Sequence, residues 1–135
     1  MHVREATPTD RVAVANVLDG AMLDTDPDLL AASIARGETL VAVASGGRTD
    51  AGDTTDTDDE RILGSLVLDA DRIASVAVRR RRRGQGIGRA LVEAALTERD
   101  ELVAEFDERV RPFYESLGFE IEPVDGEGGR YRGHR

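Results

Sequence analysis

The sequence has 135 residues, 40% of them hydrophobic, which suits one domain with one core and is too short for two. Its net charge is −9, all 18 basic residues are arginine, and there is no cysteine. This composition excludes disulfides and cysteine chemistry, and it disfavours coating of a nucleic-acid duplex, which needs local basicity. The histidines, His2 and His134, lie at the termini, which argues against a zinc site or a histidine-based triad.

The acidic, lysine-free composition is typical of a cytosolic protein from a salt-loving organism, whose carboxylates keep the surface hydrated in molar salt. A GC-rich genome is the alternative explanation for the missing lysines. No apolar run has the length needed to span a bilayer, and no basic-then-apolar leader is present. We therefore expect a cytoplasmic protein without a membrane partner.

Apolar periodicity and turn signals predict the element order β-α-α-β-β-β-α-β-α-β-β along the chain. Pro8 and Asp26-Pro27 mark helix starts, and Gly37 marks a helix stop. The predicted strands are 1–7, 39–44, 62–68, 73–78, 102–106, 118–124 and a short one near Tyr131. The predicted helices are 8–23, 26–37, 108–117 and, after the glycine segment, one that carries Ile87, Leu91, Ala94 and Ala95.

Residues 45–60 contain six acids and almost no apolar side chain, which predicts a mobile, solvated hairpin loop between two strands and not a domain linker. The alternation of strands and helices predicts one mixed α/β domain over residues 1–135, built on a central sheet.

Three alternating glycines, Gly84, Gly86 and Gly88, lie between a predicted strand and a predicted helix. Such a segment lets several backbone N–H groups converge on a phosphate at a helix N-terminus. A P-loop is excluded, because no Gly-Lys-Ser/Thr follows. The dinucleotide fingerprint fits the first two glycines and Asp107, but Arg89 occupies its third glycine position. A plain glycine turn that caps a helix is the structural alternative.

Two motifs decide between these interpretations. Val76-x-Val78, four residues, Arg83-Gly84-x-Gly86-Ile87-Gly88, two residues and Leu91 resembles the acyl-CoA binding motif of the GNAT superfamily of N-acyltransferases. About 25 residues downstream, Phe113-Tyr114-Glu115-Ser116-Leu117-Gly118-Phe119 resembles that superfamily's second signature. The element order agrees over essentially the whole chain. The resemblance implies a central, mostly antiparallel sheet flanked by helices, with strands that splay apart at the acyl-CoA site.

The resemblance also implies which residues bind acetyl-CoA, with no metal. Main-chain groups of Val76 and Val78 would pair with the pantetheine amides as an added strand does. Amides of the glycine segment would hold the pyrophosphate, where glycine permits close approach. The residues implied in that segment are Arg83, Gly84, Gln85, Gly86, Ile87, Gly88 and Arg89. Arg79–Arg82 either neutralise the 3′-phosphate, steer a polyanion, or form a solvated basic patch.

Tyr114 matches the family tyrosine that protonates the departing thiolate, a transfer from a phenol of pKa ~10 to a thiolate of pKa ~8.5. Phe113 and Leu117 are expected to form the apolar face of the same helix. Glu105 matches a glutamate that often serves as the base in this family, and it is equally interpretable as a solvated strand residue. Asp107 stands where relatives often carry asparagine.

The resulting prediction is an N-acetyltransferase that moves an acetyl group from acetyl-CoA to a primary amine by direct attack in a ternary complex. Asp69 and Asp71 are further candidate bases or attractors for a cationic acceptor. The acceptor is a small molecule or a protein amine, and a homodimer is compatible with the family. The alternatives are an inactive CoA-binding or protein-interaction module with the same fold, a nucleotide-binding enzyme, and an RNA-binding protein that uses the arginine run.

Overall fold

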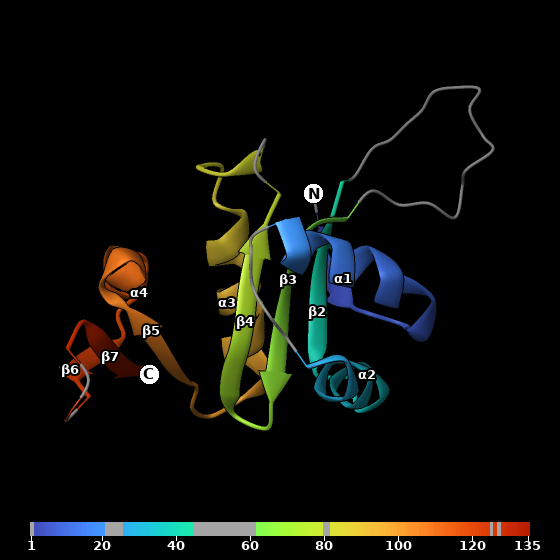
Figure 1. Ribbon diagram of the computed structural model, residues 1–135. Coiled ribbons are helices and arrows are strands. Elements are labelled where there is room, and N and C mark those ends of the chain that lie inside the picture. Colours follow the sequence, from blue (N-terminus) through green and yellow to red (C-terminus); the bar gives the residue numbers. More distant parts are fainter. Residues whose placement is uncertain (1, 21–25, 45–61, 80–81, 125, 127) are drawn as a thin grey trace.

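The computed structural model describes residues 2–20, 26–44, 62–79, 82–124, 126 and 128–135 (Figure 1). The strands are β1 (His2–Glu5), β2 (Thr39–Val43), β3 (Ile62–Asp69), β4 (Arg72–Val78), β5 (Val103–Asp107), β6 (Glu120–Pro123) and β7 (Arg130–His134). The helices are α1 (Arg11–Gly20), α2 (Pro27–Ala35), α3 (Ile87–Glu98) and α4 (Arg111–Ser116), with short 3-10 turns η1 (Pro8–Asp10) and η4 (Glu108–Val110). This order of helices and strands is the predicted one.

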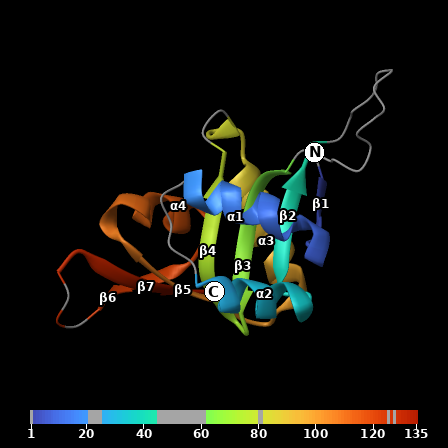
Figure 2. The same ribbon diagram turned by 45° about the vertical axis from the view of Figure 1, so that its right-hand side comes forward.

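One sheet of seven strands runs in the order β1-β2-β3-β4-β5-β7-β6. Every neighbouring pair is antiparallel except β4 and β5, which are parallel. Helices α1 and α2 cover one face of β2–β4, α3 covers the other face, and α4 lies beside β5–β7 (Figures 1 and 2). The predicted mixed α/β fold with a mostly antiparallel sheet is thus confirmed.

Strand β2 explains why the sheet is covered on both faces. All five of its residues are buried, as expected for a continuous apolar run. Leu40 and Ala42 belong to the cluster beneath α3, whereas Val41 and Val43 belong to the cluster beneath α1 and α2. Side chains of a strand alternate between faces, so this one run supplies both cores.

An irregularity in β4 sets the geometry of the sheet's centre. Val67 of β3 pairs with Ser75, but the next residue pairs with Ile73, so Ala74 is an extra residue on β4. A bulge of this kind bends a strand and interrupts its pairing. The parallel ladder between β4 and β5 ends at this point, with Ile73 opposite Ala104, and Figure 1 shows the two strands diverging beyond it.

Two sequence predictions extend beyond the described residues. The first predicted helix is split into η1 and α1, and its expected end at residue 23 lies outside the described part of the chain. The predicted loop 45–60 also lies outside it, although β2 and β3 on either side pair antiparallel, as a hairpin requires. Among the described residues, no helix is long and apolar enough to cross a lipid bilayer.

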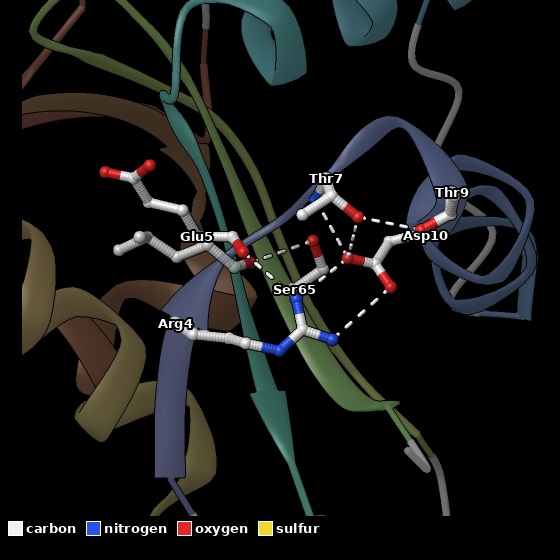
Figure 3. A network of polar contacts seen from close by, with 7 residues as sticks. Arg4, Glu5, Thr7, Thr9, Asp10 and Ser65 are labelled. Atoms are coloured by element: carbon white, nitrogen blue, oxygen red, sulfur yellow. Dashed lines mark hydrogen bonds and ion pairs between the residues drawn. The ribbon is translucent and has the colours of Figure 1, made fainter. Parts of the chain in front are cut away.

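A polar network anchors the start of the helical layer to the edge strand (Figure 3). Asp10 Oδ2 accepts hydrogen bonds from the Thr7 amide at 2.8 Å and from Arg4 Nη1 at 2.8 Å. The Thr7 amide and Asp10 form one half of a capping box that fixes the chain's turn from β1 into η1. The hydrogen bond from the Arg4 guanidinium lowers the pKa of the Asp10 carboxyl below its usual range.

We expect Asp10→Ala to lower the free energy of unfolding at pH 7 by about 1–3 kcal/mol, because a cap and a charge-assisted hydrogen bond are both lost. Since the folded-state pKa is depressed, this stabilisation is full above the unfolded pKa and disappears as pH falls through the folded value. Urea unfolding of wild type and variant at pH 7 and at about pH 2–3 measures it. Asp100→Ala, at an exposed bend, is the control; a gap that persists at low pH would contradict the assignment.

Candidate functional site

The glycine segment forms an uncapped helix start. Gly84 and Gly86 have φ of +81° and +82°, a left-handed conformation that favours glycine, and a Cβ at either position would meet nothing within 4 Å. Gly86 is the N-cap of α3 and supplies no side chain, and the first helical hydrogen bond runs from the Ala90 amide to its carbonyl. The amides of residues 87–89 therefore lack helical acceptors and can bind an anion.

Gly88 has a different reason to be glycine. A Cβ there would lie 3.2 Å from Phe113 Cε1 and 3.8 Å from Val78 Cγ2. The missing side chain lets the ring of Phe113, from α4, approach the first turn of α3 closely. Gly88 therefore joins the glycine segment to the helix that carries Tyr114, while Ile87 places its side chain in the core, at 4% exposure.

The outer edge of β4 has no strand partner among the described residues where it lies beside this helix start. The Arg79 amide donates to the Leu63 carbonyl at 2.8 Å, which directs residue 79, and by alternation Ala77, toward β3. Main-chain groups of Val76 and Val78 consequently point away from β3, toward the side where pairing with β5 has stopped. The structure thus places the two valines on an unpaired edge that leads into the glycine segment.

Tyr114 lies in an aromatic cluster and is only 6% exposed. Its ring stacks on Phe106 with centroids 4.4 Å apart, and it meets Phe113 and Phe119 edge-on at 5.0 and 5.1 Å. Leu117 is buried as expected, but Tyr114 is more deeply buried than Phe113, its neighbour on the helix. The tyrosine ring therefore belongs to the core between α4 and β5.

The hydroxyl group of Tyr114 differs from its ring. It makes no hydrogen bond to another described residue, and the one fully buried side-chain polar atom without a partner in the described ranges is Arg99 Nε. Within the described part of the chain the hydroxyl is thus without a hydrogen-bond partner, whereas the ring packs against Phe106, Phe113 and Phe119. Burial raises the pKa of Tyr114 to about 12, so the phenol keeps its proton at any physiological pH.

Glu105 is on the opposite face of β5 from Tyr114. Phe106, the next residue, stacks on Tyr114, and alternation along the strand turns Glu105 the other way. There Glu105 Oε2 accepts hydrogen bonds from Arg132 Nε at 3.2 Å and Nη2 at 3.0 Å, across the β5–β7 ladder. Oε1 makes no bond within the described part of the chain and remains available as an acceptor.

Two of the other acidic candidates, Asp107 and Asp69, have structural partners. Asp107 caps η4 by accepting from the Arg109 amide at 3.2 Å, and its second oxygen lies 3.6 Å from Arg109 Nη2. Asp69 lies 3.7 Å from Arg36 Nη2, just before the β3–β4 turn. That turn, which contains Asp71, is at the end of β4 remote from the glycine segment, so these two acids are not brought together with Tyr114.

The arginines of the segment have separate environments. Arg79 Nε donates to the Ile62 carbonyl at 2.6 Å, and Arg83 Nε donates to the Val78 carbonyl at 3.2 Å. Arg89 pairs with Glu93 at 3.2 Å and reaches the Ser116 carbonyl at 3.4 Å, a link between α3 and α4. Gln85 is exposed. Arg80 and Arg81 lie outside the described residues.

The sequence did not single out Phe106, Gly133 or Arg132, although all three shape the site. A Cβ on Gly133 of β7 would lie 3.2 Å from Phe106 Cε2, on a ring that in turn stacks on Tyr114. The alternation in Ala104-Glu105-Phe106 was a usable signal for Phe106. Arg132 and Gly133 depend on the β5–β7 register, which the sequence does not carry locally.

Tyr114 should make stability fall at high pH. Because its folded pKa is about 12 and that of an unfolded tyrosine about 10, only the folded state keeps the proton between these values. The free energy of unfolding should therefore decrease across this interval, by up to about 3 kcal/mol. In Tyr114→Phe this decrease in the free energy of unfolding should be absent. At pH 7 the substitution should change the free energy of unfolding little, because no hydrogen bond to a described residue is lost. Denaturant unfolding at several pH values measures both; identical pH slopes would contradict this.

Gly133→Ala should press Phe106 against Tyr114. We expect a loss of about 1–3 kcal/mol in the free energy of unfolding and shifted NMR signals of the Tyr114 ring, because the added methyl group overfills the contact. The matched control is Gly128→Ala in the same hairpin, where a Cβ would meet nothing within 4 Å. Equal effects of the two substitutions would contradict the proposed stack.

A family model described as an acetyltransferase (GNAT) domain matches residues 35–121 of this chain. That range contains the bulged strand β4, the glycine segment and Tyr114. A search of curated protein sequences finds no significant match.

Solved structures share the fold over nearly the whole chain. Ard1 from Thermoplasma volcanium is 20% identical, with a TM-score of 0.71 over 99% of this chain and 95% of that one. Naa50 from Arabidopsis thaliana, in complex with the bisubstrate analogue CoA-Ac-MVNAL, is 18% identical, with a TM-score of 0.71 over 99% and 97%. The PaiA N-acetyltransferase from Thermoplasma acidophilum, in complex with coenzyme A, is 15% identical, with a TM-score of 0.70 over 99% and 97%. By the match of the family model and the fold, this chain belongs to the GNAT acetyltransferase domain family.

Proposed function

We propose that this protein is an N-acetyltransferase that transfers an acetyl group from acetyl-CoA to a primary amine by direct attack in a ternary complex. One observation carries the proposal. The unpaired edge of β4 is followed by the uncapped start of α3, and Phe113 packs between this helix start and the ring of Tyr114. These are the elements that a thioester with an amide-bearing arm and a diphosphate requires.

The residues fit such a ligand. Val76 and Val78 offer main-chain groups to an extended chain carrying amides, a form of strand addition that is insensitive to side chains. The amides of residues 87–89 face a diphosphate without competition from a side-chain cap, and the positive end of the α3 dipole favours the anion. Gly84 and Gly86 leave open space where a side chain would otherwise hinder approach. Naa50 and PaiA, which share the fold, are described with a CoA-containing analogue and with coenzyme A.

In the reaction, the amine nitrogen forms a bond to the thioester carbonyl carbon, and the carbon–sulfur bond breaks with its electron pair going to sulfur. Tyr114 donates a hydrogen bond to the sulfur as negative charge develops. Complete proton transfer from a phenol of pKa about 12 to a thiolate of pKa ~8.5 is uphill. The environment of Tyr114 therefore favours stabilisation of the leaving group, with the final proton supplied by solvent.

The acceptor must lose a proton before or during attack, and Glu105 is the residue that we assign to receive it. Its free Oε1 can accept, while Arg132 holds Oε2 and so orients the carboxylate. Because Glu105 and Tyr114 lie on opposite faces of β5, the amine would approach from the face of the sheet that α4 does not cover. The net charge of −9 suits a cationic acceptor, either a small amine or a protein amine.

The first test is calorimetric titration with acetyl-CoA in molar KCl. Wild type should bind, and Gly86→Glu should abolish binding, because a carboxylate would enter the anion site from a position with φ of +82°. Gly128→Glu adds the same charge in the β6–β7 hairpin and should leave binding intact. A folded wild-type protein that does not bind acetyl-CoA would refute the proposal.

The second test measures thiol release with a panel of amines. Tyr114→Phe should lower kcat by about 10²–10³-fold with little change in acetyl-CoA affinity, because its hydrogen bond forms only as the thiolate develops. Glu105→Gln should lower kcat/KM, because an amide cannot accept the proton that the amine must lose. Binding without turnover on any amine would instead support the alternative, an inactive CoA-binding module.

A further inference from the structure

The side chain of Arg83 occupies one of the main-chain acceptors that the proposed ligand would need. Its Nε donates to the Val78 carbonyl at 3.2 Å, and the arginine is otherwise exposed. The Arg79 amide bonds to β3, so the Val78 carbonyl, one position earlier, lies on the unpaired edge of β4. Arg83 therefore bonds across the edge that is open to strand addition.

The neighbouring arginines behave differently. Arg79 bonds to the Ile62 carbonyl on the β3 side, where it cannot obstruct the open edge. The side chain of Arg82 makes no hydrogen bond or ion pair to another described residue, although its amide donates to the Arg79 carbonyl. Of the described arginines in this run, Arg83 alone combines a contact on the open edge with a position directly before Gly84.

We propose that Arg83 guards the unpaired edge of β4, in the sense that its guanidinium must be displaced before an acyl donor can pair with that edge. This competition makes the site selective for thioesters that carry a diphosphate. The inference rests on the proposed function. When an acyl donor pairs with the edge, the guanidinium must leave the Val78 carbonyl. A donor with a diphosphate at the nearby start of α3 offers the guanidinium an ion pair with phosphate in exchange for its hydrogen bond to an uncharged carbonyl. A donor without a diphosphate displaces Arg83 and offers nothing in return.

This exchange predicts effects of opposite sign for two donors. Arg83→Ala should tighten the binding of S-acetylpantetheine, which lacks phosphate, by about two- to tenfold, the range that one net hydrogen bond supplies. The same substitution should weaken acetyl-CoA binding by about fivefold or more, because a guanidinium contact with phosphate is lost. Arg83→Met, which keeps most of the side chain's length without the guanidinium, should act in the same directions.

The matched control is Arg82→Ala. It removes an equal charge one residue away without touching the Val78 carbonyl, and it should leave S-acetylpantetheine affinity unchanged. Affinities for S-acetylpantetheine are measured by NMR titration, which also reports whether each variant is folded, and those for acetyl-CoA by calorimetry. Acetyl-3′-dephospho-CoA retains the diphosphate and should show the same loss in Arg83→Ala as acetyl-CoA.

The failures of the two proposals are distinguishable. If wild type binds acetyl-CoA but Arg83→Ala and Arg83→Met leave S-acetylpantetheine affinity unchanged or weaker, Arg83 does not guard the edge, although the proposed function stands. A tightening that Arg82→Ala reproduces would show a general effect of charge and would also overturn the inference. If folded wild type binds no acetyl-CoA, the proposed function itself fails, and the guard fails with it.

Discussion

The site depends on the point at which β4 stops pairing with β5. The extra residue Ala74 bends β4 immediately after Ile73, the last residue opposite β5. Beyond that point the main-chain groups of Val76 and Val78 lack a strand partner on one side, and an unpaired edge is a template for another extended chain. The bulge and the end of the β4–β5 ladder thus fall at the same place in the sheet.

Much of the fold could be predicted because it depends on local signals. The apolar run of β2, the proline at the start of α2 and the left-handed Gly37 at its end all act within a few residues. The turn at the glycine segment could also be predicted locally, since only glycine readily adopts the conformation of Gly84 and Gly86. The paired motifs added the family, which the match over residues 35–121 confirms.

Contacts that depend on the register between distant strands could not be predicted from the sequence. Pairing of Glu105 with Arg132 requires that β7 lie beside β5 in one particular alignment, which long-range packing decides. The sequence pattern assigns Gly88 the same role as Gly84 and Gly86, whereas in the structure its missing Cβ accommodates Phe113. The depth of Tyr114 also follows from neighbours distant in sequence, notably Phe106 and Phe119. The catalytic roles of Glu105 and Tyr114 stay predictions.

The short parallel ladder between β4 and β5 also divides the sheet into two lobes that are weakly joined. Strands β1–β4 form one antiparallel ladder and β5, β7 and β6 another, and only two residue pairs join β4 to β5. The other ties between these lobes include the contact of Gly88 with Phe113 and the bond from Arg89 to Ser116. An extended ligand that pairs with β4 and also contacts the part of the sheet beside Tyr114 would fill the gap between the two parts and connect them. If the proposed function holds, the acyl donor would help to hold these two parts of the sheet together, and the fold would become more stable as the donor concentration rises.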